Sequence, residues 1–254
     1  MEISTFPTSE SASIYVAECI AENMRAKAVE NSHLVLGLAT GSSPLLLYKE
    51  LVRMHKEEDL NFENVITFNL DEYYPMPKKS AKSYYAFMHN QLFNHVNIKP
   101  QNIHLFDGTF PASKIDSFCD TYDQKIIEAG GIDFQILGIG RTGHIGFNEP
   151  GSSEDSCTRL VDLNEITRKD AASDFGDLQK VPSKAITMGI ESILKANKIY
   201  LLAWGAEKAE VIRKCFLEEV TSKLPASYLQ EQRNVELILD PAAAKLIQSN
   251  LIEN

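Results

Sequence analysis

The sequence contains few cysteines, and they do not form a recognisable set. They are scattered along the chain: Cys19, Cys119, Cys157 and Cys215. This spacing lacks the close pairs of a zinc site or of a small disulfide framework, so we expect free thiols and a reducing, cytoplasmic environment.

Long apolar runs are also missing. The longest, 34–39 and 199–204, are far too short to cross a bilayer, which needs about 20 residues. The first residues have neither the basic lead nor the apolar core of a signal peptide. We therefore expect a cytoplasmic protein without a membrane partner.

Basic side chains are outnumbered, with 25 Lys and Arg against 35 Asp and Glu and a net charge of −10. A protein that binds nucleic acid or an anionic membrane needs a basic surface, so neither partner is expected. A small anionic ligand is still allowed, because a few fixed donors can dominate one pocket. The 254 residues, 44% of them hydrophobic, contain no repeat and no flexible linker, and we expect one domain over 1–254.

Apolar runs of strand length alternate with amphipathic, helix-length segments. We expect strands at 34–39, 65–70, 103–106, 134–139, 199–204 and 235–239. We expect helices from Thr8 or Ser9 to 28, and at 45–54, 83–96, 115–128, 187–196, 205–219 and 241–252. Continuous rather than alternating apolarity is typical of strands covered on both faces. The pattern predicts an α/β fold with a doubly wound, mostly parallel, Rossmann-like sheet and helices on both faces.

Four polar or glycine-rich segments directly follow expected strands: 40–43, 69–74, 138–149 and 205–208. The carboxyl ends of parallel strands share one edge of the sheet, where ligands of open α/β sheets bind. The sequence therefore predicts that these four segments surround one binding site.

The first segment consists of Thr40, Gly41, Ser42 and Ser43 and precedes an expected helix. Backbone N–H groups at a helix N-terminus, together with hydroxyls, can bind a phosphate. The alternative is an ordinary capped turn between strand and helix. The segment is not a Walker A loop, because no Gly-Lys-Ser/Thr follows, and the dinucleotide fingerprint fits badly because Gly37 lies inside the strand.

The second segment places Asp71 and Glu72 at the end of a buried strand. A partly desolvated carboxylate there can have a raised pKa and act as a base toward a carbon acid. The alternative is that Asp71 caps a turn and Glu72 is solvated.

The third segment is rich in glycine, including Gly143, and contains His144 five residues before Glu149. A histidine can act as the acid–base catalyst while a carboxylate fixes its tautomer. The other five histidines are interpreted as surface or core residues. No second His or Cys lies at ligand spacing, so no metal is expected.

The fourth segment brings Lys208 to the first turn of an expected helix. A cation there opposes the helix dipole unless it meets an anion, which favours a phosphate ligand. The alternative is one more solvated lysine.

Together these motifs resemble the glucosamine-6-phosphate deaminase (isomerase) family. The resemblance spans nearly the whole chain and is carried by 37–44, 68–73, 83–88, 143–150, 181–182 and 205–208. It implies that glucosamine 6-phosphate and water give fructose 6-phosphate and ammonia without metal or organic cofactor. His144 is then expected to open the sugar ring, with Glu149 orienting it. Asp71 is expected to move the proton from carbon-2 to carbon-1.

The resemblance leaves three alternatives open. The first is galactosamine 6-phosphate as the substrate. The second is a hydrolase like the related 6-phosphogluconolactonases, which typically carry Arg where this chain has Tyr73. The third is a sugar-phosphate sensor without turnover.

Two positions depart from the family pattern. Thr142 stands where members commonly have Asp before the Gly-His pair, and 171–175 lacks the usual phosphate-binding Arg. Arg168 or Lys169 is one candidate replacement, and Lys208 with the serine loop is the other.

The resemblance to the regulated, hexameric members of the family is only partial. Ser152, Ser153 and Arg159 match the allosteric site of hexameric members, but Val161 stands where a Lys is expected. A homo-oligomer is a possible partner arrangement.

Overall fold

The computed structural model describes residues 1–247 and is built around a seven-stranded parallel sheet. Its strands follow the order β1-β10-β9-β6-β2-β3-β5. Their bounds are β1 Glu2–Thr5, β2 Leu34–Leu38, β3 Val65–Asn69, β5 Ile103–His104, β6 Phe134–Leu137, β9 Lys198–Ala203 and β10 Val235–Leu239. Within residues 1–247, all the strand pairings in this sheet are parallel. The six expected strands are confirmed, whereas β1 was not expected.

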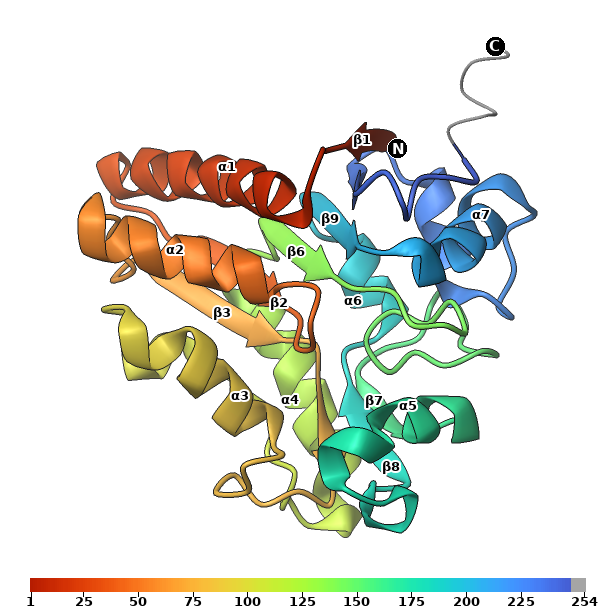
Figure 1. Ribbon diagram of the computed structural model, residues 1–254. Helices are drawn as coiled ribbons and strands as arrows, with labels where there is room; N and C mark the ends of the chain where they lie inside the picture. Colours follow the sequence, from red (N-terminus) through yellow and green to blue (C-terminus); the bar gives the residue numbers. More distant parts are fainter. Residues whose placement is uncertain (248–254) are drawn as a thin grey trace.

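Helices cover both faces of this sheet, as the sequence predicts. Residues of α1 (Ser9–Val29), α2 (Leu45–Glu57) and α3 (Tyr84–Gln91) share one core with the alternate β2 residues Leu34, Leu36 and Leu38. Residues of α4 (Ile115–Glu128), α6 (Ile190–Leu194) and α7 (Ala209–Leu217) share the opposite core with Val35. Figure 1 shows α1 and α2 side by side across the sheet.

A second sheet of three antiparallel strands was not expected. It has the order β4-β8-β7, with β4 at Asp71–Tyr74, β8 at Lys184–Thr187 and β7 at Arg159–Asp162. The expected helix at 187–196 is therefore wrong at its start. Thr187 pairs with Asp71 and Arg159, and α6 begins only after Gly189. The helix α5 (Glu165–Phe175), also not expected, connects to this sheet.

Three other expected helices differ from the structure. The segment 83–96 gives α3 followed by a single 3₁₀ turn, Phe93–His95. The segment 205–219 begins as a 3₁₀ turn, Ala206–Lys208, before α7. The segment 241–247 forms turns, and the remainder of the expected closing helix lies outside the described residues.

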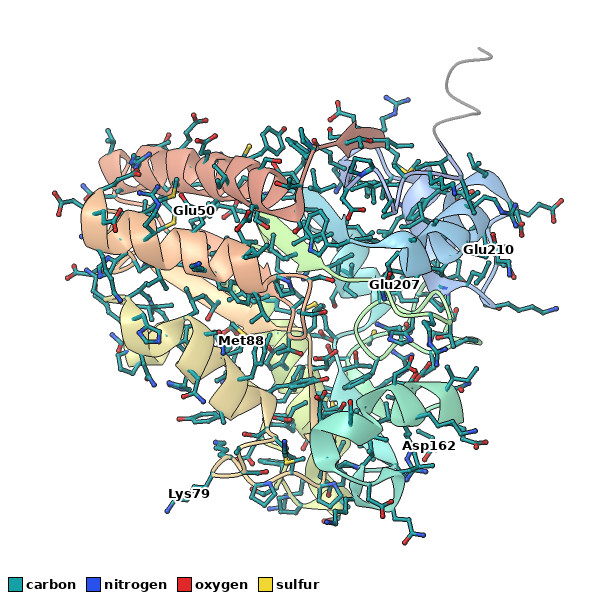
Figure 2. The ribbon with its side chains drawn as sticks, in the orientation of Figure 1. Glu50, Lys79, Met88, Asp162, Glu207 and Glu210 are labelled. Carbon is teal, nitrogen blue, oxygen red and sulfur yellow. The ribbon has the colours of Figure 1, made fainter. Side chains whose placement is uncertain are left out.

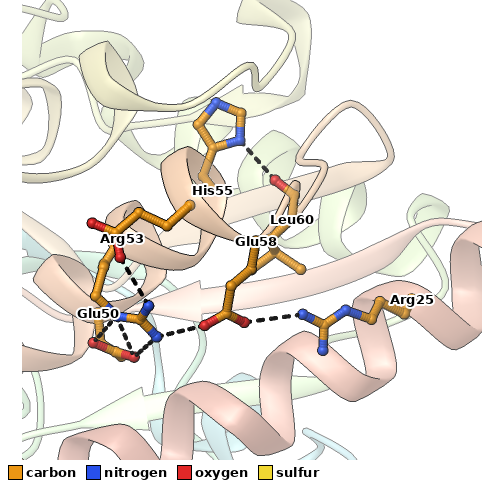
Figure 3. Close-up of polar contacts among 7 residues, drawn as sticks. Arg25, Glu50, Arg53, His55, Glu58 and Leu60 are labelled. Atoms are coloured by element: carbon orange, nitrogen blue, oxygen red, sulfur yellow. Dashed lines mark hydrogen bonds and ion pairs between the residues drawn. The ribbon is translucent and has the colours of Figure 1, made fainter.

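Ion pairs connect the outer sides of α1 and α2, as Figure 3 shows. Arg53 on α2 contacts Glu50 at 2.6 Å and Glu58 at 2.7 Å, and Glu58 reaches Arg25 of α1 at 3.5 Å. Exposed pairs of this kind each contribute at most about 1 kcal/mol, so the packed apolar faces hold the two helices together.

Within residues 1–247, no helix combines the length and the apolar character needed to span a membrane.

Candidate active site

A cavity of about 200 Å³ lies at the carboxyl ends of the parallel strands. Figure 1 shows the arrowheads of β3 and β6 directed toward this central region. The cavity is lined by Ala39, Thr40, Gly41, Ser42, Ser43, Leu70, Asp71, Tyr84, Gly138, Ile139, Gly140, His144, Gly146, Phe147 and Lys208. Each of the four predicted segments contributes to this lining, because parallel strands bring their carboxyl ends to one edge.

The loop after β2 forms one wall of the cavity, and all four of its predicted residues, 40–43, line it. Gly41 has φ +90°, a left-handed conformation that glycine adopts without strain. The Trp204 indole N–H donates to the Ser43 carbonyl at 3.0 Å, which fixes the loop to the end of β9. The loop leads directly into α2, so its hydroxyls and the helix N-terminus face the same space.

Asp71 begins β4 and lies against the cavity with only 6% of its surface exposed. Within residues 1–247 no hydrogen bond to its carboxylate is found. Burial, with a contribution from the charge of Glu72, raises the pKa of Asp71 to about 8. A desolvated carboxylate without fixed donors is well suited to accept a proton from carbon.

Glu72 does not line the cavity and is not solvated, so neither the predicted substrate-binding role nor its alternative, a solvated carboxylate, is found. Its carboxylate is buried and accepts the backbone N–H groups of Tyr73 at 2.9 Å and of Tyr84 and Tyr85 at 3.0 Å. Burial raises its pKa to about 7, although the three donors act in the opposite direction. Glu72 instead fixes the start of α3, which places Tyr84 in the lining.

His144 lies with its ring against Gly140. A Cβ added at Gly140 would lie 2.0 Å from the ring carbon Cε1, so only glycine leaves room for this imidazole. The Thr142 hydroxyl is 2.8 Å from Nδ1, and Glu149 Oε2 is 3.6 Å from the same nitrogen. Burial lowers the pKa of His144, although Glu149 acts in the opposite direction, which favours a neutral imidazole near pH 7.

Glu149 is buried, and its two oxygens differ in their surroundings. Oε1 accepts the Asn164 N–H at 3.1 Å, whereas Oε2, toward His144, has no hydrogen-bond partner among the described residues. Thr142 therefore holds the imidazole directly, and Glu149 supplies a negative charge beside it. The structure brings Thr142, His144 and Glu149 together, as the sequence predicts for the last two.

Lys208 is half-buried in the cavity wall, where its ammonium donates to the Ile139 carbonyl at 2.9 Å. Burial lowers the pKa of Lys208. Figure 2 labels the preceding residue, Glu207, near the loop that follows β6. Lys208 is therefore placed to meet a ligand bound between the loops after β2, β6 and β9.

Besides Glu72, two other predicted binding residues do not line the cavity. Gly143, at φ +74°, packs behind the loop, where an added Cβ would lie 2.9 Å from Leu224 Cδ2. Arg168 donates to the carbonyls of Leu178 at 3.2 Å and Val181 at 3.1 Å, so its guanidinium holds the turn after α5. Between the two candidate replacements for the family's phosphate-binding Arg, the geometry favours Lys208.

The three residues matched to the allosteric site border a separate hollow. Arg159 donates to Asn148 Oδ1 and to Ser152 Oγ, each at 2.9 Å, and Ser153 lies on the same rim. Glu149 borders this hollow as well. A regulatory role for Ser152, Ser153 and Arg159 stays a prediction.

Tyr84 and Phe147 line the cavity and were not predicted as site residues. Their rings stack at 5.9 Å, and Tyr73 packs on both at 5.0 and 5.2 Å. In the sequence they belong to an apolar stripe and a glycine-rich loop, where local pattern does not distinguish a pocket wall from core.

No group of three or more His, Cys, Asp or Glu in residues 1–247 is arranged to hold a metal ion.

Comparison with known proteins identifies relatives over almost the whole chain. The family described as glucosamine-6-phosphate isomerases/6-phosphogluconolactonase matches residues 7–238. The glucosamine-6-phosphate deaminase of Clostridium acetobutylicum is 44% identical over 97% of this chain and all of its own length. A glucosamine-6-phosphate deaminase-like protein of Bacteroides thetaiotaomicron is 43% identical over 94% of this chain, but this chain spans only 36% of that longer protein.

A solved structure shares the fold throughout. It is a monomeric glucosamine-6-phosphate deaminase, 39% identical, with a TM-score of 0.91 over 97% of this chain and all of its own. These likenesses confirm the family resemblance and the α/β fold. The chain belongs to the family of glucosamine-6-phosphate isomerases and 6-phosphogluconolactonases, and within it to the glucosamine-6-phosphate deaminases.

Proposed function

We propose that this protein is the enzyme that converts glucosamine 6-phosphate and water to fructose 6-phosphate and ammonia. The observation that carries the proposal is one cavity lined both by a buried carboxylate, Asp71, that has no hydrogen bond within residues 1–247, and by a positioned imidazole, His144. Lys208 and the serine loop, on the same lining, are the ligands we assign to the phosphate.

The first step we assign is ring opening by His144. A neutral imidazole accepts the proton of the anomeric hydroxyl and returns a proton to the ring oxygen, which produces the open-chain aldehyde. The Glu149 carboxylate, 3.6 Å from Nδ1, stabilises the transient imidazolium, and the Thr142 hydroxyl orients the ring.

The second step is enolisation by Asp71. The aldehyde makes the carbon-2 proton acidic, so the Asp71 carboxylate removes it and delivers it to carbon-1 through a cis-enediol-like intermediate. Water then adds at carbon-2 and ammonia leaves, which gives the ketone. No step needs a cofactor, since electrons move only within the substrate.

The rate depends on the ionised form of Asp71. Because burial raises its pKa to about 8, kcat is expected to rise as pH increases from 6 to 8 and to level off above about 8. A pH profile of kcat measures this. A profile that falls over the same range contradicts a carboxylate base with a raised pKa.

Galactosamine 6-phosphate and 6-phosphogluconolactone are the competing substrates, and a sensor without turnover is the remaining alternative. The test incubates purified protein with glucosamine 6-phosphate, galactosamine 6-phosphate and 6-phosphogluconolactone, and measures ammonia, ketose phosphate and acid. We expect equimolar ammonia and fructose 6-phosphate from glucosamine 6-phosphate. Hydrolysis of the lactone without ammonia release, or binding without any product, would replace the proposal by one of the alternatives.

We further propose that the chain acts as one domain in the cytoplasm. Cavity-lining residues come from positions 39 to 208, so separate parts of the chain build one site. The four cysteines are free, which suits a reducing compartment. The sequence leaves a homo-oligomer as possible, but the similar solved deaminase is monomeric, and we propose catalysis by a single chain.

A further inference from the structure

The cavity has too little positive charge for a phosphate dianion. Within residues 1–247, Lys208 is the only lysine or arginine on its lining, and Asp71 on the same lining carries the opposite charge when ionised. A phosphate monoester brings a charge of about −1.5 to −2 at pH 7. Lys208 is also half-buried and already donates to a carbonyl. A second cation near the phosphate would relieve this imbalance.

Arg141 is the cation placed to do so. It follows Gly140, a lining residue, in a turn closed by the Gly143 N–H donating to the Gly140 carbonyl at 3.0 Å. Burial is the main cause of the lowered pKa of Lys208; the charges of Glu207 and Asp170 act against it, and the smaller effect of Arg141 acts with it. Both members of the Arg141–Asp170 pair therefore lie within electrostatic range of Lys208. Its side chain is 57% exposed and does not support the core.

In the structure Arg141 is paired with Asp170 of α5. Arg141 Nε donates to Asp170 Oδ2 at 2.9 Å, and Nη2 contacts Oδ1 in the same bidentate pair. Figure 1 shows α5 beside the loop that follows β6, so the pair connects the rim of the cavity to this helix. An exposed ion pair is worth little in water, so the guanidinium can exchange the carboxylate of Asp170 for two oxygens of a phosphate at little cost.

We propose that Arg141 is a phosphate-binding residue that leaves Asp170 for the phosphate of the bound sugar. This inference rests on the proposed function and adds a specificity residue to it. Asp170, which is 41% exposed, is then left to water, and while it is paired it competes with the phosphate for the same guanidinium.

Competition between Asp170 and the phosphate for Arg141 has a measurable consequence that a purely structural ion pair does not have. Removing Arg141 weakens phosphate binding, whereas removing the charge of Asp170 strengthens it. A pair that merely fixes α5 against the loop makes the two substitutions act in the same direction, because either one breaks the same contact.

The experiment measures binding of fructose 6-phosphate by calorimetry, and KM and kcat for glucosamine 6-phosphate, in four proteins. These are the wild type, Arg141→Ala, Asp170→Asn and the control Arg53→Ala. The control removes Arg53 of α2, which pairs with Glu50 and Glu58 (Figure 3). None of these three residues lines the cavity. Thermal melts establish that all four are folded.

We expect Arg141→Ala to weaken binding and raise KM about 10- to 100-fold, with kcat within about threefold, since a charged hydrogen bond to a non-reacting group is lost. We expect Asp170→Asn to tighten binding about three- to tenfold and Arg53→Ala to change it less than twofold. Equal weakening by Arg141→Ala and Asp170→Asn, or no effect of Arg141→Ala, would overturn the proposal. If the four proteins bind as expected but none releases ammonia, the proposed function fails while this inference stands.

Discussion

Asp71 and Glu72 are adjacent in the sequence but have opposite surroundings. Glu72 accepts three backbone N–H groups, and Asp71 faces the cavity without a hydrogen bond from any described residue. Alternation along β4 sends the two side chains to opposite faces. The sequence predicts that a carboxylate stands at the strand end, but only the packing of α3 shows which of the two is free.

The raised pKa of Asp71 makes a prediction about stability. Its folded-state pKa of about 8 lies above the ordinary value of 3.8, so the folded protein binds more protons than the unfolded chain between these values. The contribution of this group to folding is therefore fully present below about pH 4 and is lost as pH rises toward 8. Asp71→Asn should remove this loss.

Urea unfolding at pH 5 and pH 8 measures the effect. Relative to wild type, we expect Asp71→Asn to gain on the order of 4 kcal/mol between pH 5 and pH 8. Parallel pH dependence of the two proteins would mean that Asp71 titrates near its ordinary pKa.

Gly140 is predicted to affect catalysis only by leaving room for the ring of His144. A Cβ there would lie 2.0 Å from His144 Cε1, and the ring can rotate away because it is the far end of a side chain. We expect Gly140→Ala to keep the melting temperature within a few degrees and to lower kcat about 10²- to 10³-fold, as loss of a positioned acid–base group does. The double variant with His144→Gln should be no slower than His144→Gln alone. Independent, multiplying losses would show that Gly140 acts elsewhere.

Among the elements, α3 has the most direct effect on the cavity. Its N-cap Ser83 accepts the Ala86 N–H at 3.0 Å, and its first residue, Tyr84, lines the cavity. The N-cap of α1, Thr8, accepts the Ser11 N–H at 3.1 Å, in a helix that contributes no lining residue. The two residues make the same N-cap hydrogen bond at different positions, although Ser83 is buried and its hydroxyl also lies 3.0 Å from the Lys78 carbonyl and 2.8 Å from the Ser80 carbonyl.

We expect Ser83→Ala and Thr8→Ala each to lower the free energy of unfolding by about 0.5–2 kcal/mol. Only Ser83→Ala should also lower kcat/KM, because only α3 carries a cavity residue at its start. Chemical denaturation and steady-state kinetics on both variants test this. Equal kinetic effects, or a purely kinetic effect of either, would contradict the argument.

The elements of the large sheet could be predicted because their signal is local. Runs such as 34–39 are continuously apolar, and Thr8 caps α1 as the sequence indicates. The small sheet has no such signal. The strands β4, β7 and β8 have four residues each and include Asp, Glu, Arg and Lys. They depend on non-local pairing, because β8 lies 110–116 residues from its partners in β4 and 22–28 residues from its partners in β7. Pairing with β4 and β7 makes 184–187 a strand, where periodicity alone predicts a helix at 187.

For the whole molecule, the position of the site follows from the topology of the parallel sheet. Which side chains line the cavity does not follow from it. Four loops converge because the strands are parallel, which the sequence predicts. Gly143 lies within one of these segments, yet it faces Leu224, and Arg168, on α5, faces the turn after that helix. The direction of a side chain depends on what packs beside it, and that information is not local.

The residues that line the cavity all come from one chain, and this leads to a prediction about the active species. We expect the specific activity to be independent of protein concentration, with the active species at 28.4 kDa. Sedimentation combined with assays over a hundredfold range of concentration tests this. Activity that disappears on dilution together with a larger species would show that a second copy is needed.

The central claim is that Asp71 is the carbon-2 base, and one variant tests it most directly. Asp71→Asn keeps the shape of the side chain and removes the base. Turnover of glucosamine 6-phosphate should fall about 10³-fold or more, while binding of fructose 6-phosphate stays within a few-fold of wild type, since positioned proton transfer supplies factors of roughly 10²–10⁴. Near-wild-type release of ammonia by Asp71→Asn, in a preparation free of host deaminase, would contradict the account.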